Sequence, residues 1–283
     1  MVPLLFSTAV HALALSSIVG FVGTRPWTAV SLSNSQSLTA PAEIAASLVA
    51  SDCVIELPGI ASKGECQHLI DSCVASAAAQ SSEPRTGLDA VGLVRLPSLA
   101  AAARAAKTGT PCASPVSADA DALAEELLLR CMSVLEENFP TLRPRLFGDA
   151  SESLCAMYRA GELEFSSREP GINVYGAGGQ FLPHKDHQAL TVLLPLSQPC
   201  DFEGGGTSFW HQDSRGHRVE APSVVLRPPA GSALIFSGHV THAGVPVDAG
   251  TRVAYVASFS ARGGRRLRQA ASTVSFDVYG DVI

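Results

Sequence analysis

The sequence lacks a strong excess of charge of either sign, and it lacks internal repeats. In its 283 residues, 20 Lys and Arg face 26 Asp and Glu, which leaves a formal net charge of −6. So mild a balance gives no reason to propose nucleic acid or an acidic membrane surface as a partner. No unit of about 20–50 residues recurs along the chain, which argues against solenoids and propellers.

Cysteine is present but never as a C-x-x-C pair, so a zinc knuckle or a thioredoxin-type centre is not expected. In an oxidising compartment, disulfides are expected first among Cys53, Cys66 and Cys73. The odd count leaves at least one thiol unpaired within the chain. The full set is Cys53, Cys66, Cys73, Cys112, Cys131, Cys155 and Cys200.

Acidic residues are missing from residues 1–42, which hold a single arginine, Arg25, and an apolar run from Val2 to Val22. This composition is typical of a targeting sequence, and a cleaved secretory signal is our first interpretation. It would direct the protein to the secretory pathway and endoplasmic reticulum, or to an organelle reached through a two-part address. An uncleaved membrane anchor and a buried helix of the domain are the alternatives.

Residues 50–150 are predicted to form a helical N-terminal support region. Asp52–Leu57 has the pattern of a short strand, and Ser62 with Glu65 forms the S-x-x-E capping box that opens a helix. A loop rich in alanine, glycine and proline is expected to follow. Apolar residues at helical spacing then predict a long amphipathic helix over Ala118–Asn138, which would brace a sheet.

Residues 151–262 consist of short apolar runs separated by Gly, Pro and Asp, a pattern that is typical of a β-sandwich or β-barrel. The remaining residues, 263–283, are interpreted as a C-terminal tail. Arginines cluster at its start, from Arg262 to Arg268, either as a solvated loop or as a contact for an acidic partner. The predicted strands are Leu154–Tyr158, Gly171–Tyr175, Ala189–Leu194, Thr207–Trp210, Val224–Leu226, Ala233–Phe236 and Val253–Phe259.

Two histidines and one carboxylate form a candidate metal site. Residues i and i+2 of a strand point to the same face, so His184 and Asp186 can converge on one ion. A distant third ligand comes from His239 or His242. Two histidines with one carboxylate form the facial triad that suits non-haem Fe(II), and this set leaves coordination positions open. An ordinary His–Asp hydrogen bond in a surface hairpin is the alternative.

Arg252 follows His242 across a Pro/Gly-containing hairpin. A planar guanidinium binds a carboxylate through two parallel hydrogen bonds, so Arg252 could hold the far carboxylate of a metal-bound 2-oxo acid. Gly204-Gly-Gly is not followed by Lys-Ser/Thr, and we interpret it as a tight turn rather than a phosphate loop. Trp210 is a weaker candidate for a wall of the substrate pocket.

These pieces, in order and spacing, resemble the Fe(II)/2-oxoglutarate-dependent dioxygenase superfamily, in particular its prolyl 4-hydroxylase-like branch. The resemblance covers roughly residues 175–259. It is carried by Tyr175, Phe181-x-x-His184-x-Asp186, Thr191-x-Leu193, Glu203-Gly-Gly-Gly-Thr-x-Phe209, Pro229-x-Gly231-x-Ala233-Leu-Ile-Phe236 and His242-x-Gly244-x-Pro246-Val247-x-x-Gly250-x-Arg252.

The resemblance implies an α+β fold: a double-stranded β-helix, or jelly roll, as catalytic core with N-terminal supporting helices. It makes His184, Asp186 and His242 the iron ligands and favours His242 over His239. Arg252 would pair with the C5 carboxylate of 2-oxoglutarate, and Tyr175 would help to hold that co-substrate. Prolyl 4-hydroxylases usually carry Lys at the Arg252 position, so this departure puts proline, but not 2-oxoglutarate, in doubt.

The implied activity is hydroxylation of an unactivated C–H bond with O2, giving succinate and CO2, with Fe(II) as cofactor and ascorbate as reductant. A peptidyl residue, proline first, is the expected substrate. A free amino acid or another small metabolite is the alternative within enzymes. A catalytically silent jelly-roll module, or a cupin-type metal protein, is the alternative outside them. Cupins would show a His-x-His pair followed by a later Glu and His, and this set is absent.

Overall fold

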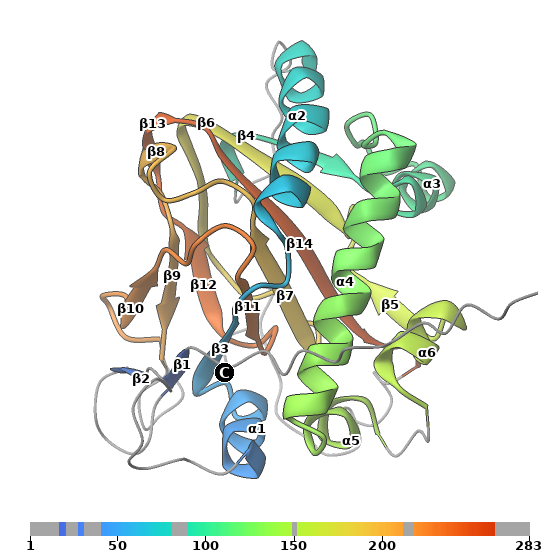
Figure 1. Ribbon diagram of the computed structural model, residues 1–283, viewed down its shortest axis with the longest axis vertical. Helices are drawn as coiled ribbons and strands as arrows, with labels where there is room; N and C mark the ends of the chain where they lie inside the picture. Colours follow the sequence, from blue (N-terminus) through green and yellow to red (C-terminus); the bar gives the residue numbers. More distant parts are fainter. Residues whose placement is uncertain are drawn as a thin grey trace, which may run out of the picture.

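A strongly curved antiparallel sheet forms the centre of the structure, a computed structural model that describes residues 17–20, 28–30, 41–80, 90–148, 152–211 and 218–263 (Figure 1). The strands are β1 Ser17–Gly20, β2 Thr28–Val30, β3 Cys53–Leu57, β4 Ala90–Pro97, β5 Leu163–Phe165, β6 Gly171–His184, β7 Leu190–Pro195, β8 Phe202–Gly204, β9 Thr207–Trp210, β10 Val224–Leu226, β11 Ala233–Phe236, β12 Thr241–Gly244, β13 Val247–Gly250 and β14 Arg252–Ala261. The helices are α1 Pro41–Val49, α2 Lys63–Gln80, α3 Leu99–Thr108, α4 Ala118–Asn138, α5 Leu142–Phe147 and α6 Leu154–Arg159.

The long strand β6 joins the two layers of the sheet. Its first half pairs with β14, and its second half pairs with β12. The chain turns between the halves at a glycine-rich stretch. A Cβ on Gly179 would come within 2.7 Å of the carbonyl oxygens of Gly176 and Gly92, so no larger residue fits there. The strand order β10-β9-β12-β6-β14-β7-β11-β3 therefore folds over on itself, which confirms the predicted double-stranded β-helix.

Alternation along β14 divides its side chains between two apolar cores. Val253, Tyr255 and Phe259 pack in the core shared with the helices, whereas Ala254 and Val256 face the space between the layers. Residues that alternate in a strand point to opposite faces, so one strand serves both cores. The same rule places the residue before this run, Arg252, on the inner face.

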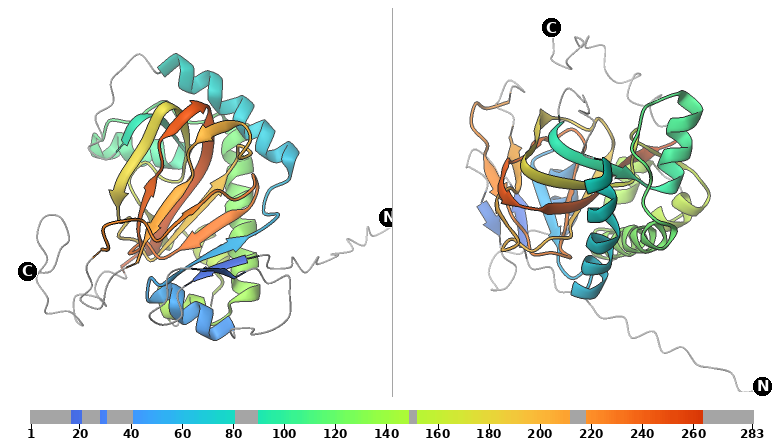
Figure 2. Two further views of the ribbon diagram at one scale, coloured as in Figure 1. Left: turned by 90° about the vertical axis from the view of Figure 1, so that its left-hand side faces the viewer. Right: turned by 90° about the horizontal axis from the view of Figure 1, so that it is seen from above.

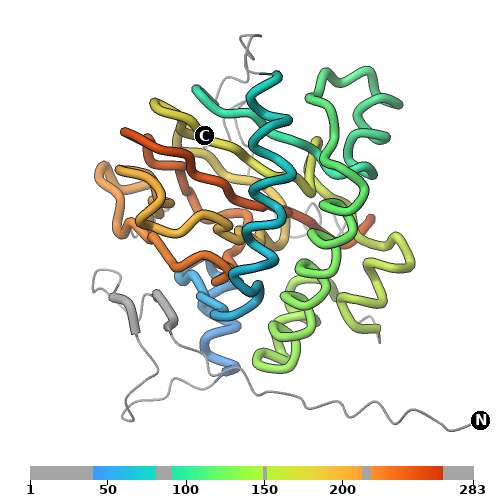
Figure 3. The backbone as a smooth tube through the Cα atoms, turned by 45° about the horizontal axis from the view of Figure 1, so that its top comes forward, coloured from blue at the N-terminus to red at the C-terminus, as the bar shows by residue number. Residues whose placement is uncertain are grey.

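Helices α2 and α4 run side by side across the outer face of the sheet, and the view from above shows the helices gathered on that face (Figures 2 and 3). The predicted capping box is formed: Ser62 N donates to Glu65 Oε2 at 2.7 Å, and Glu65 N donates to Ser62 Oγ at 3.3 Å. Arg130 of α4 pairs with Glu65 at 2.9 Å. This hydrogen bond is the largest cause that lowers the pKa of Glu65, to about 2. It ties α4 to the start of α2.

Several expectations for the first half of the chain need correction. The predicted strand Leu154–Tyr158 is helix α6, because Ser153 Oγ accepts from Ala156 N and Glu136 accepts from Leu154 N. The support region is not only helical, since β3 pairs with β11 and β4 pairs with β6. Helix α3, with Ser98 as N-cap and Gly109 as left-handed C-cap, lies in the predicted loop.

The first three cysteines form no disulfide, and all seven cysteines are free. Burial raises the pKa of Cys53 to about 12, of Cys66 to about 11 and of Cys73 to about 12, so these thiols stay protonated and unreactive. Of the predicted targeting segment, residues 1–42, only β1, β2 and the first two residues of α1 lie within the described residues. The predicted tail lies outside them apart from its first residue. No described helix is long and apolar enough to cross a membrane.

Candidate metal centre

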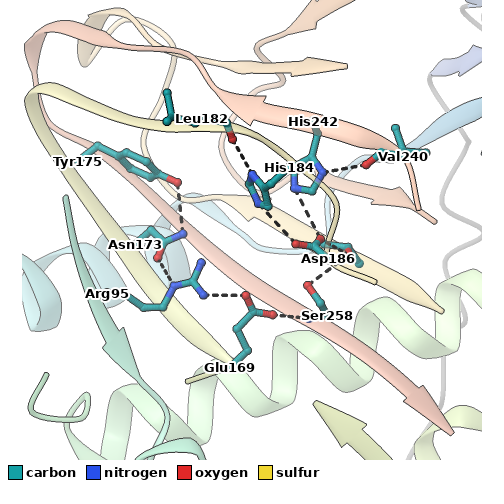
Figure 4. Close-up of polar contacts among 11 residues, drawn as sticks. Arg95, Glu169, Asn173, Tyr175, Leu182, His184, Asp186, Val240, His242 and Ser258 are labelled. Atoms are coloured by element: carbon teal, nitrogen blue, oxygen red, sulfur yellow. Dashed lines mark hydrogen bonds and ion pairs between the residues drawn. The ribbon is translucent and has the colours of Figure 1, made fainter. Parts of the chain in front are cut away.

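Three of the predicted residues meet in the space between the two layers. His184 is the last residue of β6, Asp186 follows in the next loop, and His242 lies on β12 directly opposite His184. Asp186 stands between the histidines. Its Oδ1 is 3.6 Å from His184 Nε2, and its Oδ2 is 3.6 Å from His242 Nε2 (Figure 4). One ligand atom from each residue can be chosen so that all lie within 4.8 Å of one another.

Backbone carbonyls orient both imidazole rings. His184 Nδ1 is 2.7 Å from Leu182 O, and His242 Nδ1 is 3.1 Å from Val240 O. A carbonyl can only accept a hydrogen bond, so each ring carries its proton on Nδ1 and keeps the Nε2 lone pair free. Both lone pairs face Asp186. Metal-binding histidines are commonly oriented by such a second hydrogen bond.

The protonation states also suit a cation. Burial lowers the pKa of His242 to about 4, so its ring is neutral at neutral pH. Burial alone would raise the pKa of Asp186. Interactions with the adjacent His242 and His184, and the hydrogen bond from Thr191, outweigh it and hold that pKa well below its usual range. Thr191 Oγ1 donates to Asp186 Oδ2 at 2.6 Å, which fixes the carboxylate. Burial would lower the pKa of His184, but the neighbouring Asp186 raises it. A metal ion displaces the proton of a histidine that it binds, so the site can offer one anionic and two neutral ligands.

Arg252 and Tyr175 line the same pocket and contact each other. They are paired across β14 and β6, and the guanidinium carbon lies 4.8 Å from the centre of the Tyr175 ring. Arg252 is only 3% exposed. Its Nη2 donates to Thr207 Oγ1 at 3.1 Å, whereas its buried Nη1 has no hydrogen-bond partner among the described residues. A buried donor without a partner is costly and is expected to bind an acceptor.

A buried polar network underlies the pocket. Glu169 is 3% exposed; its Oε1 pairs with Arg95 Nη1 at 2.8 Å, and its Oε2 accepts from Ser258 N at 2.7 Å (Figure 4). Arg95 Nε donates to Asn173 Oδ1 at 2.8 Å, and Asn173 Nδ2 donates to the Tyr175 hydroxyl oxygen at 3.2 Å. Because its oxygen already accepts from Asn173, the Tyr175 hydroxyl can direct its proton elsewhere.

Breaking this network is expected to destabilise the fold. Glu169→Ala leaves Arg95 without its counter-charge and Ser258 N without an acceptor, so we expect a loss of about 3 kcal/mol in the free energy of unfolding. Urea denaturation measures it. Glu126→Ala removes an exposed i,i+4 partner of Arg130 and should cost at most about 0.5 kcal/mol. Equal losses in the two variants would contradict the role given to Glu169.

The alternative third ligand, His239, does not belong to this cluster. Its ring centre is 6.3 Å from that of His187, an exposed residue in a left-handed conformation with φ of 57°. Trp210 is buried under Arg218 and does not line the pocket. Sequence reasoning missed the network beneath the site. Asn173 could have been found two residues before Tyr175 on the same strand face, but nothing local signals Arg95 or Glu169.

The donor set fits Fe(II) together with a 2-oxo acid. Two neutral imidazoles and one carboxylate, with open positions, match the ligands of non-haem Fe(II) oxygenases. The unpartnered Nη1 of Arg252 supplies a donor for a distal carboxylate in the same pocket. The fold and the site thus define the class of protein: a jelly-roll metal enzyme with a buried cationic donor for an anionic co-substrate.

Comparison with known families leads to the same class. Residues 170–259 match the family model of the 2OG-Fe(II) oxygenase superfamily. The matched segment contains the three clustered residues and Arg252, so this domain belongs to that superfamily and the protein is one of its enzymes. Fe(II) and 2-oxoglutarate are the metal and co-substrate that the family and the triad imply. No curated protein sequence matches the chain significantly.

Solved structures with a similar chain course have low sequence identity. A prolyl-4-hydroxylase from Pseudomonas putida is 18% identical with a TM-score of 0.44, over 74% of this chain and 93% of that one. A viral collagen prolyl hydroxylase from Paramecium Bursaria Chlorella virus-1 is 15% identical with a TM-score of 0.40, over 74% and 96%. The α-ketoglutarate-dependent epimerase SnoN from nogalamycin biosynthesis is 15% identical with a TM-score of 0.44, over 77% and 82%.

Proposed function

We propose that this oxygenase hydroxylates an unactivated C–H bond of a peptidyl residue, with proline as the first candidate. The observation that carries the proposal is the combination of the intact triad with the unpartnered, buried guanidinium nitrogen of Arg252. Bound Fe(II), with 2-oxoglutarate and O2, would supply the oxidative decarboxylation that yields succinate and CO2 and drives oxidation of the C–H bond.

The residues of the site have separate roles in this proposal. His184, Asp186 and His242 would hold the metal through the two Nε2 atoms and the carboxylate. Arg252 would bind the distal carboxylate of 2-oxoglutarate, and Thr207 and the Tyr175 ring keep its guanidinium in place. The presence of Asp186 also favours hydroxylation, since relatives that halogenate carry a small residue there to admit a halide.

The charges around the pocket favour an uncharged substrate group. Arg95 and Arg252 carry positive charge, and Glu169 and Asp186 carry negative charge, so the lining is neutral when the histidines are neutral. Fe(II) and the 2-oxoglutarate dianion also cancel. The carboxylate and the ammonium group of a free amino acid would each lose hydration in this partly buried space, whereas an amide-linked residue carries neither charge. This supports a peptide over the alternative of a free amino acid or small metabolite.

Succinate release from 2-oxoglutarate and Fe(II) tests the proposal across proline-containing peptides, other peptides and free amino acids, with and without ascorbate. We expect substrate-dependent release with peptides, and stimulation by ascorbate as reductant. Stimulation by free amino acids alone would replace the peptidyl assignment. A protein that binds metal but releases no succinate with any of them would support the silent jelly-roll module instead.

A further inference from the structure

A second pocket, of about 500 Å³, lies outside the catalytic pocket and shares no lining residue with it. Its walls come from α3, from β5 and the loop after it, from Gln188 and from the residue that follows β14. Figure 1 shows α3 and β5 on the side of the sheet away from β8 and β10. Its volume falls within the range of about 300–1,000 Å³ typical of small-molecule sites. The proposed hydroxylase activity does not use this pocket.

Three arginines from separate segments line the pocket: Arg104 on α3, Arg168 in the loop before β6, and Arg262 just after β14. No ion pair joins any of them to an acidic group of the described residues. Glu164 is the one carboxylate in the lining, which leaves a local charge of about +2. Burial and the nearby charge of Arg262 lower the pKa of Arg104, as expected when cations gather without a counter-ion. The lining of the pocket therefore carries more positive than negative charge.

The protein fixes part of this arrangement in advance. Arg104 Nη2 donates to the backbone carbonyl of Glu169, and its guanidinium carbon lies 5.9 Å from the centre of the Phe165 ring. Arg168 has a left-handed φ of 63°, which is uncommon for a residue with a side chain. Hydroxyl groups of Thr108, Thr110, Ser166 and Ser167 also line the pocket and add polar groups among the arginines.

We infer that this pocket binds a doubly charged oxyanion of the kind carried by a phosphate monoester. Guanidinium groups recognise phosphate through paired hydrogen bonds, and a phosphate offers three acceptor oxygens and a charge close to −2, which matches the local charge of the pocket. The ligand is a phosphorylated metabolite or a phosphorylated peptide segment. This site is separate from the metal centre, so it does not depend on the proposed hydroxylase activity.

Isothermal titration with inorganic phosphate at constant ionic strength tests the inference. We expect saturable binding, weakened about tenfold or more by Arg168→Gln or Arg262→Gln, since a hydrogen bond to a charged group contributes about 1.5–3 kcal/mol. Both side chains are exposed, so the variants should fold. Arg145→Gln, an exposed arginine of α5 outside the pocket, is the matched control and should bind phosphate normally.

A further variant separates the two anion sites. Phosphate held by the catalytic pocket would be lost in Arg252→Ala and kept in the double variant Arg168→Gln/Arg262→Gln; the inference requires the opposite. Absence of saturable binding, or binding that survives the double variant, overturns it. Phosphoserine as a free amino acid and within a peptide then distinguishes the sources, because the tighter binder identifies the kind of ligand.

Discussion

Asp186→Ala is expected to abolish metal binding and turnover. The carboxylate lies 3.6 Å from both Nε2 atoms and is the one anionic member of the cluster. Its loss leaves two neutral imidazoles, so we expect the affinity for Fe(II) to fall by at least about 100-fold, more than the loss of a group that only orients a ligand would cost. Anaerobic titration with Fe(II) or Co(II) measures the affinity, and succinate release measures turnover.

The control for this variant is Asp71→Ala, which removes an exposed carboxylate from α2 and should leave both readouts unchanged. Circular dichroism checks that the Asp186 variant keeps its fold. Succinate release near the wild-type rate in a folded Asp186→Ala protein would show that the metal is held elsewhere.

Arg252→Ala is expected to raise the concentration of 2-oxoglutarate needed for turnover by about 100-fold while metal affinity is retained. Removing one partner of a buried, hydrogen-bonded charge pair costs about 2–5 kcal/mol, and about 2.7 kcal/mol corresponds to that factor. Arg252 does not belong to the cluster of candidate ligands, so metal binding should remain. Initial rates at varied 2-oxoglutarate, together with the metal titration, separate the two effects.

Two comparisons sharpen this prediction. Arg252→Lys keeps the charge but not the paired hydrogen bonds, so its requirement for 2-oxoglutarate should lie between those of wild type and Arg252→Ala. The thermal stabilisation that 2-oxoglutarate gives the wild-type protein should be lost with alanine. An unchanged dependence on 2-oxoglutarate in Arg252→Ala would remove this residue from the co-substrate site.

Much of the site could be predicted from the sequence because the motifs that form it are short and local. The H-x-D triplet, and His242 followed by Arg252 across one hairpin, keep short spacings that strand geometry turns into convergence on one pocket. Helix α4 spans the predicted Ala118–Asn138, since twenty-one residues of consistent spacing leave little ambiguity. Short secondary-structure elements were harder to predict. The run Leu154–Tyr158 is as apolar as a strand, but the cap at Ser153 makes it a helix.

The sequence by itself therefore determined the class of enzyme and the group of residues that forms the candidate metal centre. Only the tertiary structure decided what surrounds that centre. Arg95 reaches Asn173 because β4 pairs with β6 in one register, and Arg104, Arg168 and Arg262 meet because three distant segments end beside one pocket. Strand pairing and packing bring together residues that are far apart in the sequence, and their spacing along the sequence does not predict these contacts.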